Sequence, residues 1–347
     1  MKIALLSGAY VNAGDFLIEN RSAKLILQNI PQADITILKR NIAYDVEELN
    51  RYDAIIFGGG PGFQKKIYPN RMPFVEDISK LSTPYYIMGW GWKGRNISQS
   101  AYCISKLSKE MLMFVKGAAG MLSCRDYYTI KFLEKYGITN TIMTGCPAWY
   151  NLDLVNDLRF KCPKEDEIKK ICISDPASTV NVDTFLEIIQ WVAMKYKDAD
   201  IHVVFHRGLP DNIEQSCVAL KNSFPCLNID EISGGYEGFS IYDDCDLHIG
   251  FRVHAHIYNL SRGNVSYLIN EDARGYGVND ALGCKNVDAT RNGIILPRRN
   301  SAGEVINQLE QAIDVSLIDD NSWHLVADNI KKYHRTMQDF LKSIKAR

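Results

Sequence analysis

Short apolar runs alternate with amphipathic stretches through the first 150 residues of the chain. Apolar runs bounded by turn residues predict strands, and apolar positions three and four apart predict helices. The predicted strands are 3–7, 34–38, 54–57, 85–88 and 120–123, and the predicted helices are 16–29, 98–115 and 129–136. Strands and helices that alternate in this way are typical of βαβ units around a parallel sheet.

The same alternation begins again at residue 170. Between residues 149 and 170 the periodicity fades and charged residues crowd together, which indicates a domain boundary. The second series has predicted strands at 170–174, 202–205, 246–250 and 265–270, and predicted helices at 182–196, 212–224 and 254–260. We therefore expect an α/β protein with two Rossmann-like domains, at residues 1–155 and 165–320.

A last predicted helix, at residues 322–346, carries an apolar stripe. Its apolar residues recur at spacings of three, four and seven, which is the pattern of a helix with one buried face. Such a stripe needs a partner surface, and we expect this helix to pack back on the N-terminal domain.

Composition and charge exclude several classes of protein. Hydrophobic residues make up 46% of the 347 positions and charged residues 23%, which excludes a disordered chain. The formal net charge of −1 gives no reason to expect a nucleic-acid partner. The nine cysteines are scattered without a C-x-x-C pair, and no spacing of His, Asp or Glu matches a metal site. With no signal-peptide pattern and no run of about 18 apolar residues, we expect a cytoplasmic protein without a bound metal.

Four loops of unusual content follow predicted strands. They are residues 12–15 (Asn-Ala-Gly-Asp), 58–62 (Gly-Gly-Gly-Pro-Gly), 123–126 (Ser-Cys-Arg-Asp) and 251–254 (Phe-Arg-Val-His). Ligands of open α/β sheets bind beyond the carboxyl ends of strands, where helix N-termini point N–H groups at anions. Each loop also has a structural interpretation: a helix cap, a tight turn, a surface ion pair, and a hydrogen-bonded histidine beside a solvated arginine. None has the glycine pattern of a dinucleotide fingerprint or the lysine of a P-loop.

The fourth loop is the most informative. Arg252 and His254 stand two residues apart at the start of a predicted helix, where both would face the cleft between the domains. The guanidinium can bind an anionic substrate there, and the imidazole can exchange a proton near neutral pH. In the third loop, Arg125 is a second candidate for binding a carboxylate or a phosphate.

Taken in order, these motifs resemble the polysaccharide pyruvyl transferase family. The series Asn-x-Gly-Asp, Gly-Gly-Gly, Arg-Asp, Gly-x-Pro-Ala and Arg-x-His is found at residues 12–15, 58–60, 125–126, 145–148 and 252–254. The resemblance implies two Rossmann-like domains in a glycosyltransferase-B-like arrangement with an interdomain cleft. It also implies that the enolpyruvyl unit of phosphoenolpyruvate is moved onto two hydroxyls of a sugar, which yields a pyruvate ketal and free phosphate.

The resemblance also implies roles for individual residues. The donor site of the family would use Arg252 and His254 with Val253 between them, together with Arg125. The N-terminal aspartate of the family corresponds to Asp15. On this basis the two arginines clamp the carboxylate and phosphate of the donor, and no tightly bound cofactor is expected. His254 as an imidazolium protonates the methylene carbon, and Asp15 accepts the proton of the attacking hydroxyl.

The acceptor side is less well defined. Glycines let a ligand approach the backbone closely, and indole rings stack on sugars. Five residues are therefore candidates for acceptor binding: Asn12, Gly59, Gly60, Trp90 and Trp92. One departure from the family also falls here, because the family often has a lysine after the last predicted strand where this chain has Arg274.

Residues 60–120 carry a concentrated positive charge. Nine lysines and arginines face only three acidic residues, a net charge of +6 that is interleaved with aromatic residues. One interpretation is a solvated basic face. The other is docking on an anionic membrane or on a lipid-diphosphate-linked sugar. We therefore expect a glycan acceptor, free or lipid-linked, and peripheral contact with the inner face of the membrane is the sharper of the two hypotheses.

Two other classes of function are left open by the sequence. One is a nucleotide-sugar-dependent glycosyltransferase of the same fold, which would need a base-and-ribose pocket that no sequence feature demonstrates. The other is a non-catalytic carbohydrate-binding protein, against which the joint presence of Asp15, Arg125, Arg252 and His254 argues.

Overall fold

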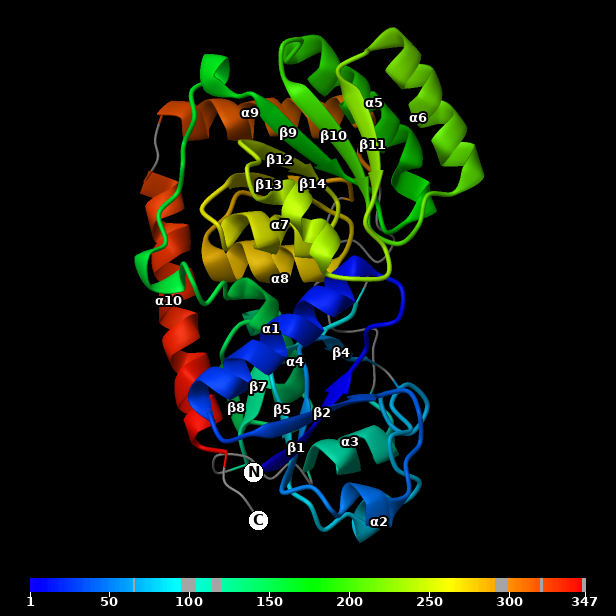
Figure 1. The fold of residues 1–347 in the computed structure, drawn as a ribbon, viewed down its shortest axis with the longest axis vertical. Coiled ribbons are helices and arrows are strands. Elements are labelled where there is room, and N and C mark those ends of the chain that lie inside the picture. Colours follow the sequence, from blue (N-terminus) through cyan, green and yellow to red (C-terminus); the bar gives the residue numbers. More distant parts are fainter. Residues whose placement is uncertain (65, 95–103, 114–119, 291–298, 319–320, 345–347) are drawn as a thin grey trace.

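The computed structural model shows two α/β halves. It describes residues 1–64, 66–94, 104–113, 120–290, 299–318 and 321–344. In Figure 1 the N-terminal half (blue to green) lies below the C-terminal half (green to orange), and a long helix (red) runs along one side of both. The named strands pair in parallel throughout both halves, as the alternating pattern predicted.

The N-terminal half contains two four-stranded sheets. The first has the order β2-β1-β3-β5, made of β1 (Lys2–Ser7), β2 (Asp34–Lys39), β3 (Ala54–Phe57) and β5 (Tyr85–Ile87). The second has the order β4-β6-β7-β8, made of β4 (Gly60–Phe63), β6 (Trp90–Trp92), β7 (Leu122–Cys124) and β8 (Thr141–Met143). The helices of this half are α1 (Ala13–Asn29), α2 (Val46–Leu49), α3 (Lys106–Met113) and α4 (Tyr127–Glu134).

Two glycine turns carry the chain from the first sheet into the second. Only two residues separate β3 from β4, and only two separate β5 from β6. In the second turn Gly89 has a φ of +65°, and a Cβ there would lie 2.6 Å from the carbonyl oxygen of Gly145. The sequence predicted β3 and β5 but treated β4 and β6 as loops, because strands of three or four residues that contain glycine leave no alternating pattern.

The C-terminal half is built on one six-stranded sheet. Its order is β11-β10-β9-β12-β13-β14, made of β9 (Lys170–Ser174), β10 (Asp200–Phe205), β11 (Leu227–Glu231), β12 (Leu247–Gly250), β13 (Val265–Asn270) and β14 (Val287–Asp288). Its helices are α5 (Val182–Lys195), α6 (Asp211–Ser223), α7 (Val253–Leu260), α8 (Ala273–Leu282) and α9 (Ala302–Ile318). Figure 1 shows α7 and α8 between this sheet and the N-terminal half.

The long helix α10 (Asn321–Lys342) contacts both halves. It packs against α1 and against α8, so the partner surface of the predicted stripe includes the C-terminal half as well. At one end the ring of Trp323 stacks on Phe160 with 5.1 Å between centroids, and further along Tyr333 packs against Trp149. Residues 345 and 346 of the predicted helix lie outside the described residues.

One apolar core continues through both halves. Leu25 of α1, Trp149, Ile257 of α7 and Ile330 of α10 belong to the same buried cluster. A second cluster, which includes Phe57, lies in the N-terminal half and reaches Ala273 at the start of α8. Because buried side chains cross the junction without a break, the position of α1 relative to α7 is fixed by close packing.

The glycine turn at residue 89 gives a test of the fold. Gly89→Ala and Gly137→Ala both place a side chain at positive φ, which costs about 1–2 kcal/mol. Only at residue 89 does the new Cβ also meet backbone, whereas nothing lies within 4 Å at residue 137. We expect Gly89→Ala to lower the free energy of unfolding by about 1–3 kcal/mol more than Gly137→Ala, measured by urea denaturation. Equal losses in the two variants would contradict the turn.

Candidate functional site

α1 and α7 meet with their amino ends at the junction of the two halves. α1 begins beyond the carboxyl end of β1, and α7 begins beyond the carboxyl end of β12. Gly14, in the first turn of α1, lies directly against the imidazole of His254, and a Cβ at residue 14 would overlap that ring. The backbone N–H of Ala13 donates a 3.0 Å hydrogen bond to the carbonyl oxygen of His206 in the C-terminal half. Asp15 follows one residue later, so Asp15 and His254 come from opposite halves and share one site.

Three arginines line this junction, and an aspartate holds each of them. Nε of Arg252 donates to Asp175 at 2.7 Å, and its Nη2 donates to the second carboxylate oxygen of Asp175. The other two pairs are Arg125 with Asp126 (Nε to Oδ2, 3.2 Å) and Arg274 with Asp272 (Nη2 to Oδ2, 2.6 Å). Ion pairs of this kind fix the plane of the guanidinium group, so the arginines are oriented before any ligand arrives.

The pair of Arg125 and Asp126 is buried rather than a surface pair, with both side chains only 2% exposed. Asp126 also caps α4, because its carboxylate accepts a 2.8 Å hydrogen bond from the backbone N–H of Thr129. α8 of the other half comes so close that a Cβ on Gly277 would lie 2.7 Å from Cγ of Asp126. α8, the helix that carries Arg274, therefore packs against the ion pair of Arg125 and Asp126 in the N-terminal half.

The surroundings of His254 favour its neutral form. Its pKa is lowered to about 4, chiefly by burial; the charge of Asp15 opposes this shift, and the charges of Arg274, Arg125 and Arg252 add to it. Because Coulomb interactions weaken with distance, these are the charges that act most strongly on the imidazole. The structure thus brings together Asp15, Arg125, Arg252 and His254, and it adds Arg274.

Four further charged residues of the site were missed by the sequence analysis: Arg40, Lys93, Asp175 and Asp272. Arg40 follows β2 and packs against Gly8, and the charge of Asp15 acts on it. Lys93 follows β6, and the charge of Arg274 is a main cause of the lowered pKa of Lys93, after its partial desolvation. The signal that could have found these residues is their position at the carboxyl ends of strands, which Asp175 occupies directly after a predicted strand.

Comparison with known protein families identifies the family to which this chain belongs. A family model of polysaccharide pyruvyl transferases matches residues 12–258, a span that runs from Asn12 through His254. The chain belongs to the polysaccharide pyruvyl transferase family. No curated protein sequence matches it.

Solved structures share the fold of this pyruvyl transferase family member. MnaA of S. aureus, solved with UDP, aligns with a TM-score of 0.61 and 9% identity over 96% of this chain and 92% of that chain. The UDP-GlcNAc 2-epimerase of Neisseria meningitidis, bound to UDP-GlcNAc, aligns with a TM-score of 0.60 and 12% identity over 98% of each chain. At this level of identity the likeness shows the fold alone, and it confirms two Rossmann-like domains in a glycosyltransferase-B-like arrangement.

Two residues expected to bind the acceptor lie in the core of this family member instead. Trp90 is fully buried, and its ring packs edge-on against Phe57 and Phe63 at 5.1 and 5.4 Å between centroids. Trp92 is 2% exposed and stacks on Phe132. The prediction that these indoles stack on a sugar is therefore wrong for this structure. They belong to β6, and residues two apart in a strand point to the same side, here into the apolar core.

The other three acceptor candidates divide between packing and the site. Gly59 packs against Pro147, where a Cβ would lie 2.5 Å from Cδ, so its lack of a side chain serves internal packing. Gly60 is buried and begins β4. Asn12 lies at the start of α1, and its Nδ2 donates a 3.1 Å hydrogen bond to the carboxylate of Asp15. Of the three, Asn12 is the residue that touches the site.

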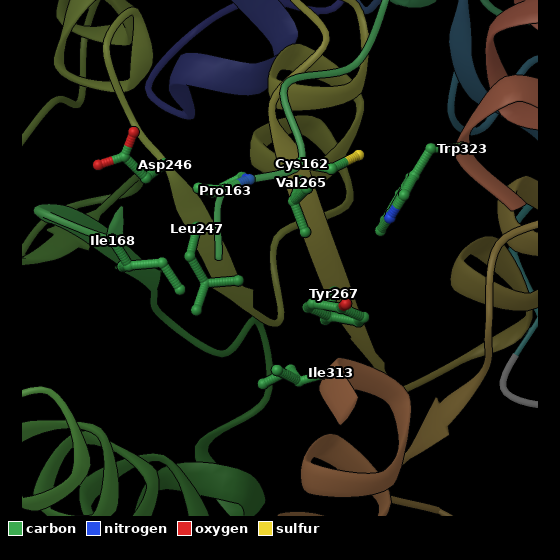
Figure 2. Close-up of a pocket in the computed structure, with 9 residues that line it drawn as sticks. All are labelled: Cys162, Pro163, Ile168, Asp246, Leu247, Val265, Tyr267, Ile313 and Trp323. Carbon is green, nitrogen blue, oxygen red and sulfur yellow. The ribbon is translucent and has the colours of Figure 1, made fainter. Parts of the chain in front are cut away.

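An apolar pocket of the C-terminal half lies away from this site. Figure 2 shows it between the linker that ends the N-terminal half and α10, and its lining includes Leu247, Val265 and Trp323. Leu247 and Val265 begin β12 and β13, whereas the site lies at the carboxyl ends of the strands. The carboxylate of Asp246 points away from the pocket and accepts two hydrogen bonds from backbone N–H groups. We interpret this pocket as a packing gap.

Among the described residues, no three His, Cys, Asp or Glu side chains come together as ligands for a metal ion. None of the helices in this part of the chain has the length and apolar composition needed to cross a membrane.

A single file of buried hydrogen bonds runs beneath the turn that carries Arg252. The backbone N–H of Arg252 donates to Oγ of Ser174 at 3.2 Å, and this oxygen lies 3.0 Å from Nε2 of His248. On the other side of that ring, Nδ1 of His248 lies 2.7 Å from Oγ of Ser266, which in turn lies 2.7 Å from Nδ1 of His256.

Satisfying the backbone N–H and both hydroxyl donors of this file gives it one direction. Burial lowers the pKa of both histidines, to about 3 for His256, so each ring carries one proton at neutral pH. Ser174 accepts from Arg252 and donates to Nε2 of His248, whose proton is then on Nδ1. Ser266 accepts that proton's hydrogen bond and donates to Nδ1 of His256. The proton of His256 is therefore on Nε2, which has no hydrogen-bond partner among the described residues.

The file ends at His256 of α7, because Nε2 of this ring has no hydrogen-bond partner among the described residues. It therefore links the turn that carries Arg252 to the interior of α7 through buried groups. Asn279 of α8 interacts with His256 and opposes the lowering of its pKa.

The direction of the file can be tested by NMR. In 15N-histidine-labelled protein we expect His248 as the Nδ1–H tautomer and His256 as the Nε2–H tautomer, with neither ring titrating between pH 5 and 8. Ser266→Ala breaks the middle of the file and should lower the free energy of unfolding by about 1–3 kcal/mol. Ser223→Ala, at an exposed serine at the end of α6, should change it little. Finding the two rings in the same tautomer would refute the assignment.

Proposed function

We propose that this chain is a pyruvyltransferase that moves the pyruvyl group of phosphoenolpyruvate onto two hydroxyls of a sugar, forming a pyruvate ketal. The acceptor sugar belongs to a cell-surface polysaccharide or to its lipid-linked precursor. The observation that carries the proposal is the junction of α1 and α7, where Asp15 and three arginines surround a neutral His254. Membership in the polysaccharide pyruvyl transferase family supports it.

The donor suits the cations of this junction. Phosphoenolpyruvate carries a carboxylate and a phosphate, and Arg125 and Arg252 bind these two groups with guanidinium planes already oriented by their aspartates. The N–H groups at the start of α7, at Val253 and His254, add the positive end of the helix dipole. Arg274 stands where the family often has a lysine and supplies a third cation beside His254.

The chemistry begins with a proton gained on donor binding. A dianionic phosphate beside His254 raises its pKa, so the imidazole becomes protonated in the complex. It gives that proton to the methylene carbon, which leaves a cationic C2 for one sugar hydroxyl to attack, while Asp15 accepts the proton of this hydroxyl. The bond between C2 and the phosphate oxygen then breaks, and phosphate leaves with the electron pair. The second hydroxyl attacks C2, gives its proton to the departing phosphate and closes the ketal.

The acceptor enters from the N-terminal half. Arg40 and Lys93 lie at the carboxyl ends of β2 and β6, within reach of the field of Asp15. The diphosphate of a lipid-linked sugar suits this pair of cations. Of the basic segment, Lys65, Arg95 and Lys116 lie outside the described residues. The other six are exposed and available to an anionic membrane surface: Lys66, Arg71, Lys80, Lys93, Lys106 and Lys109.

Removal of the acid tests the assignment. We expect His254→Ala to lower turnover at least about 100-fold while the protein stays folded, because general acid catalysis contributes about 10²–10⁴-fold. The measurement is phosphate release from phosphoenolpyruvate across a panel of free and lipid-diphosphate-linked glycans. The matched control is His202→Ala, whose imidazole is hydrogen-bonded to Asp230 on the C-terminal sheet and should not affect turnover. Near-normal turnover of His254→Ala would rule out the role of this residue. Calorimetric binding of a nucleotide sugar but not of phosphoenolpyruvate would instead support a glycosyltransferase.

Proton uptake is a second, independent test. The pKa of His254 is about 4 in the free protein, and a bound phosphate raises it. At pH 6 the free imidazole is neutral and the bound one is charged, so binding takes up as much as one proton and the affinity falls as the pH rises. Calorimetry of phosphoenolpyruvate binding in buffers of different ionisation enthalpy measures this number. His254→Gln should bind without proton uptake, and an unchanged uptake in that variant would show that another group titrates.

A further inference from the structure

A second pocket between the halves lies on another flank of α1. It has a volume of about 530 Å³ and is lined by one face of α1, by residues 150–153, and by Tyr236, Tyr258 and Arg262 of the C-terminal half. With 3.6 residues per turn, the pocket-lining positions of α1 fall on one face, and Asp15 points to the opposite side. This pocket is therefore separate from the junction that holds His254.

Two guanidinium groups, one from each half, lie over the same aromatic ring in this pocket. Cζ of Arg21 is 5.1 Å from the centroid of the Tyr258 ring, and Cζ of Arg262 is 5.7 Å from it. The hydroxyl of Tyr258 donates a 2.6 Å hydrogen bond to Asp243, and Nε of Arg262 lies 3.2 Å from the same carboxylate oxygen. Asp243 thus holds both groups in place at the end of α7.

Arg21 is the less compensated of the two cations. Its side chain donates to the carbonyl oxygen of Ala148, the residue is 7% exposed, and within the described residues it forms no ion pair. Burial lowers the pKa of Arg21 to about 10, and the positive charge of Arg262 contributes to that lowering. A buried guanidinium that faces a second one without its own carboxylate is unfavourable, and a bound anion would remove that cost.

We propose that this pocket binds a small phosphorylated ligand, held between Arg21 of α1 and Arg262 beyond α7. Lys24 stands one turn further along α1 at the exposed rim and adds a third cation. The amide of Asn151 and the hydroxyl of Tyr236 supply hydrogen-bonding groups for the rest of the ligand. The volume is within the range of small-molecule sites, which is about 300–1,000 Å³.

The same two helices build both sites. α1 and α7 both start at the junction, where Gly14 contacts His254. The pocket lies further along the two helices, since Arg21 is about 9 Å from Asp15 along the axis of α1. A ligand that bridges Arg21 and Arg262 therefore stabilises the packing of α1 against α7. We expect its binding to raise the melting temperature of the protein.

Calorimetry with inorganic pyrophosphate tests the proposal. Pyrophosphate also suits the donor arginines, so the wild-type protein should bind it at two sites. Arg262→Gln should weaken the pocket site at least about 10-fold and keep the other, and Arg252→Gln should do the reverse. Because the two sites fail separately, loss of the donor site would not affect this proposal. An Arg262→Gln protein that binds pyrophosphate as the wild type does would overturn it.

Two further variants separate binding from folding. Lys24→Gln changes only an exposed side chain of α1 and should weaken the pocket site about threefold to tenfold without lowering the melting temperature. Lys221→Gln, at an exposed lysine of α6, is the matched control and should retain both sites. Titration of a nucleoside diphosphate and of a glycosyl diphosphate into Arg252→Gln protein then identifies the source of the phosphate by the tighter binding. Wild-type affinity of Lys24→Gln and Arg262→Gln together would refute the site.

Discussion

The close approach of α1 to α7, with Gly14 against the ring of His254, is the contact on which the rest of the site depends. It joins the carboxyl ends of β1 and β12, which belong to different sheets, and so brings a carboxylate from one half to an imidazole of the other. The apolar core that runs through both halves, together with α10, holds the two helices in this position. Any side chain at residue 14 would separate them, and Asp15 would no longer share a site with His254.

The electrostatics of the junction follow from that packing. Three guanidinium groups around one imidazole repel one another, and the structure offsets this repulsion with three aspartates that come from three different elements. The balance is visible at Asp272: burial favours its neutral form, yet Arg274 holds the pKa of the Asp272 carboxyl below its ordinary value. The aspartates cancel most of the charge and leave the arginine planes in place. In the structure without a ligand, burial and the arginines together keep the pKa of the imidazole low.

The sequence predicted those elements whose local pattern and tertiary role agree. β9 and β13 were predicted at their observed bounds, and the fold class followed from their alternation with helices. β4 and β6 were missed because they are short and contain glycine. α8 was missed for a related reason, since Gly275 and Gly277 lower its helix propensity. Residue 277 must nevertheless be small, because Asp126 of the other half lies against it. Contacts between distant segments explain why residue 277 is glycine, and no local sequence pattern shows such contacts.

α9 was missed for a different reason. Val305, Leu309 and Ile313 recur at spacings of four, so the helical pattern was present in the sequence but was not used.

The same distinction separates the site residues that were predicted from those that were not. Arg252 and His254 are neighbours in sequence at a strand end, so a rule about strand ends finds them. Asp175 follows a predicted strand as well, but it is 77 residues from Arg252, and only the pairing of β9 with β12 brings the two side chains together. Trp90 satisfies the rule about strand ends equally well, yet burial of its large apolar surface draws the ring into the core. The rule about strand ends therefore identifies the loops that surround the site. Which side chains of such a loop face the ligand depends on the free energy gained by burying each side chain instead of leaving it in water.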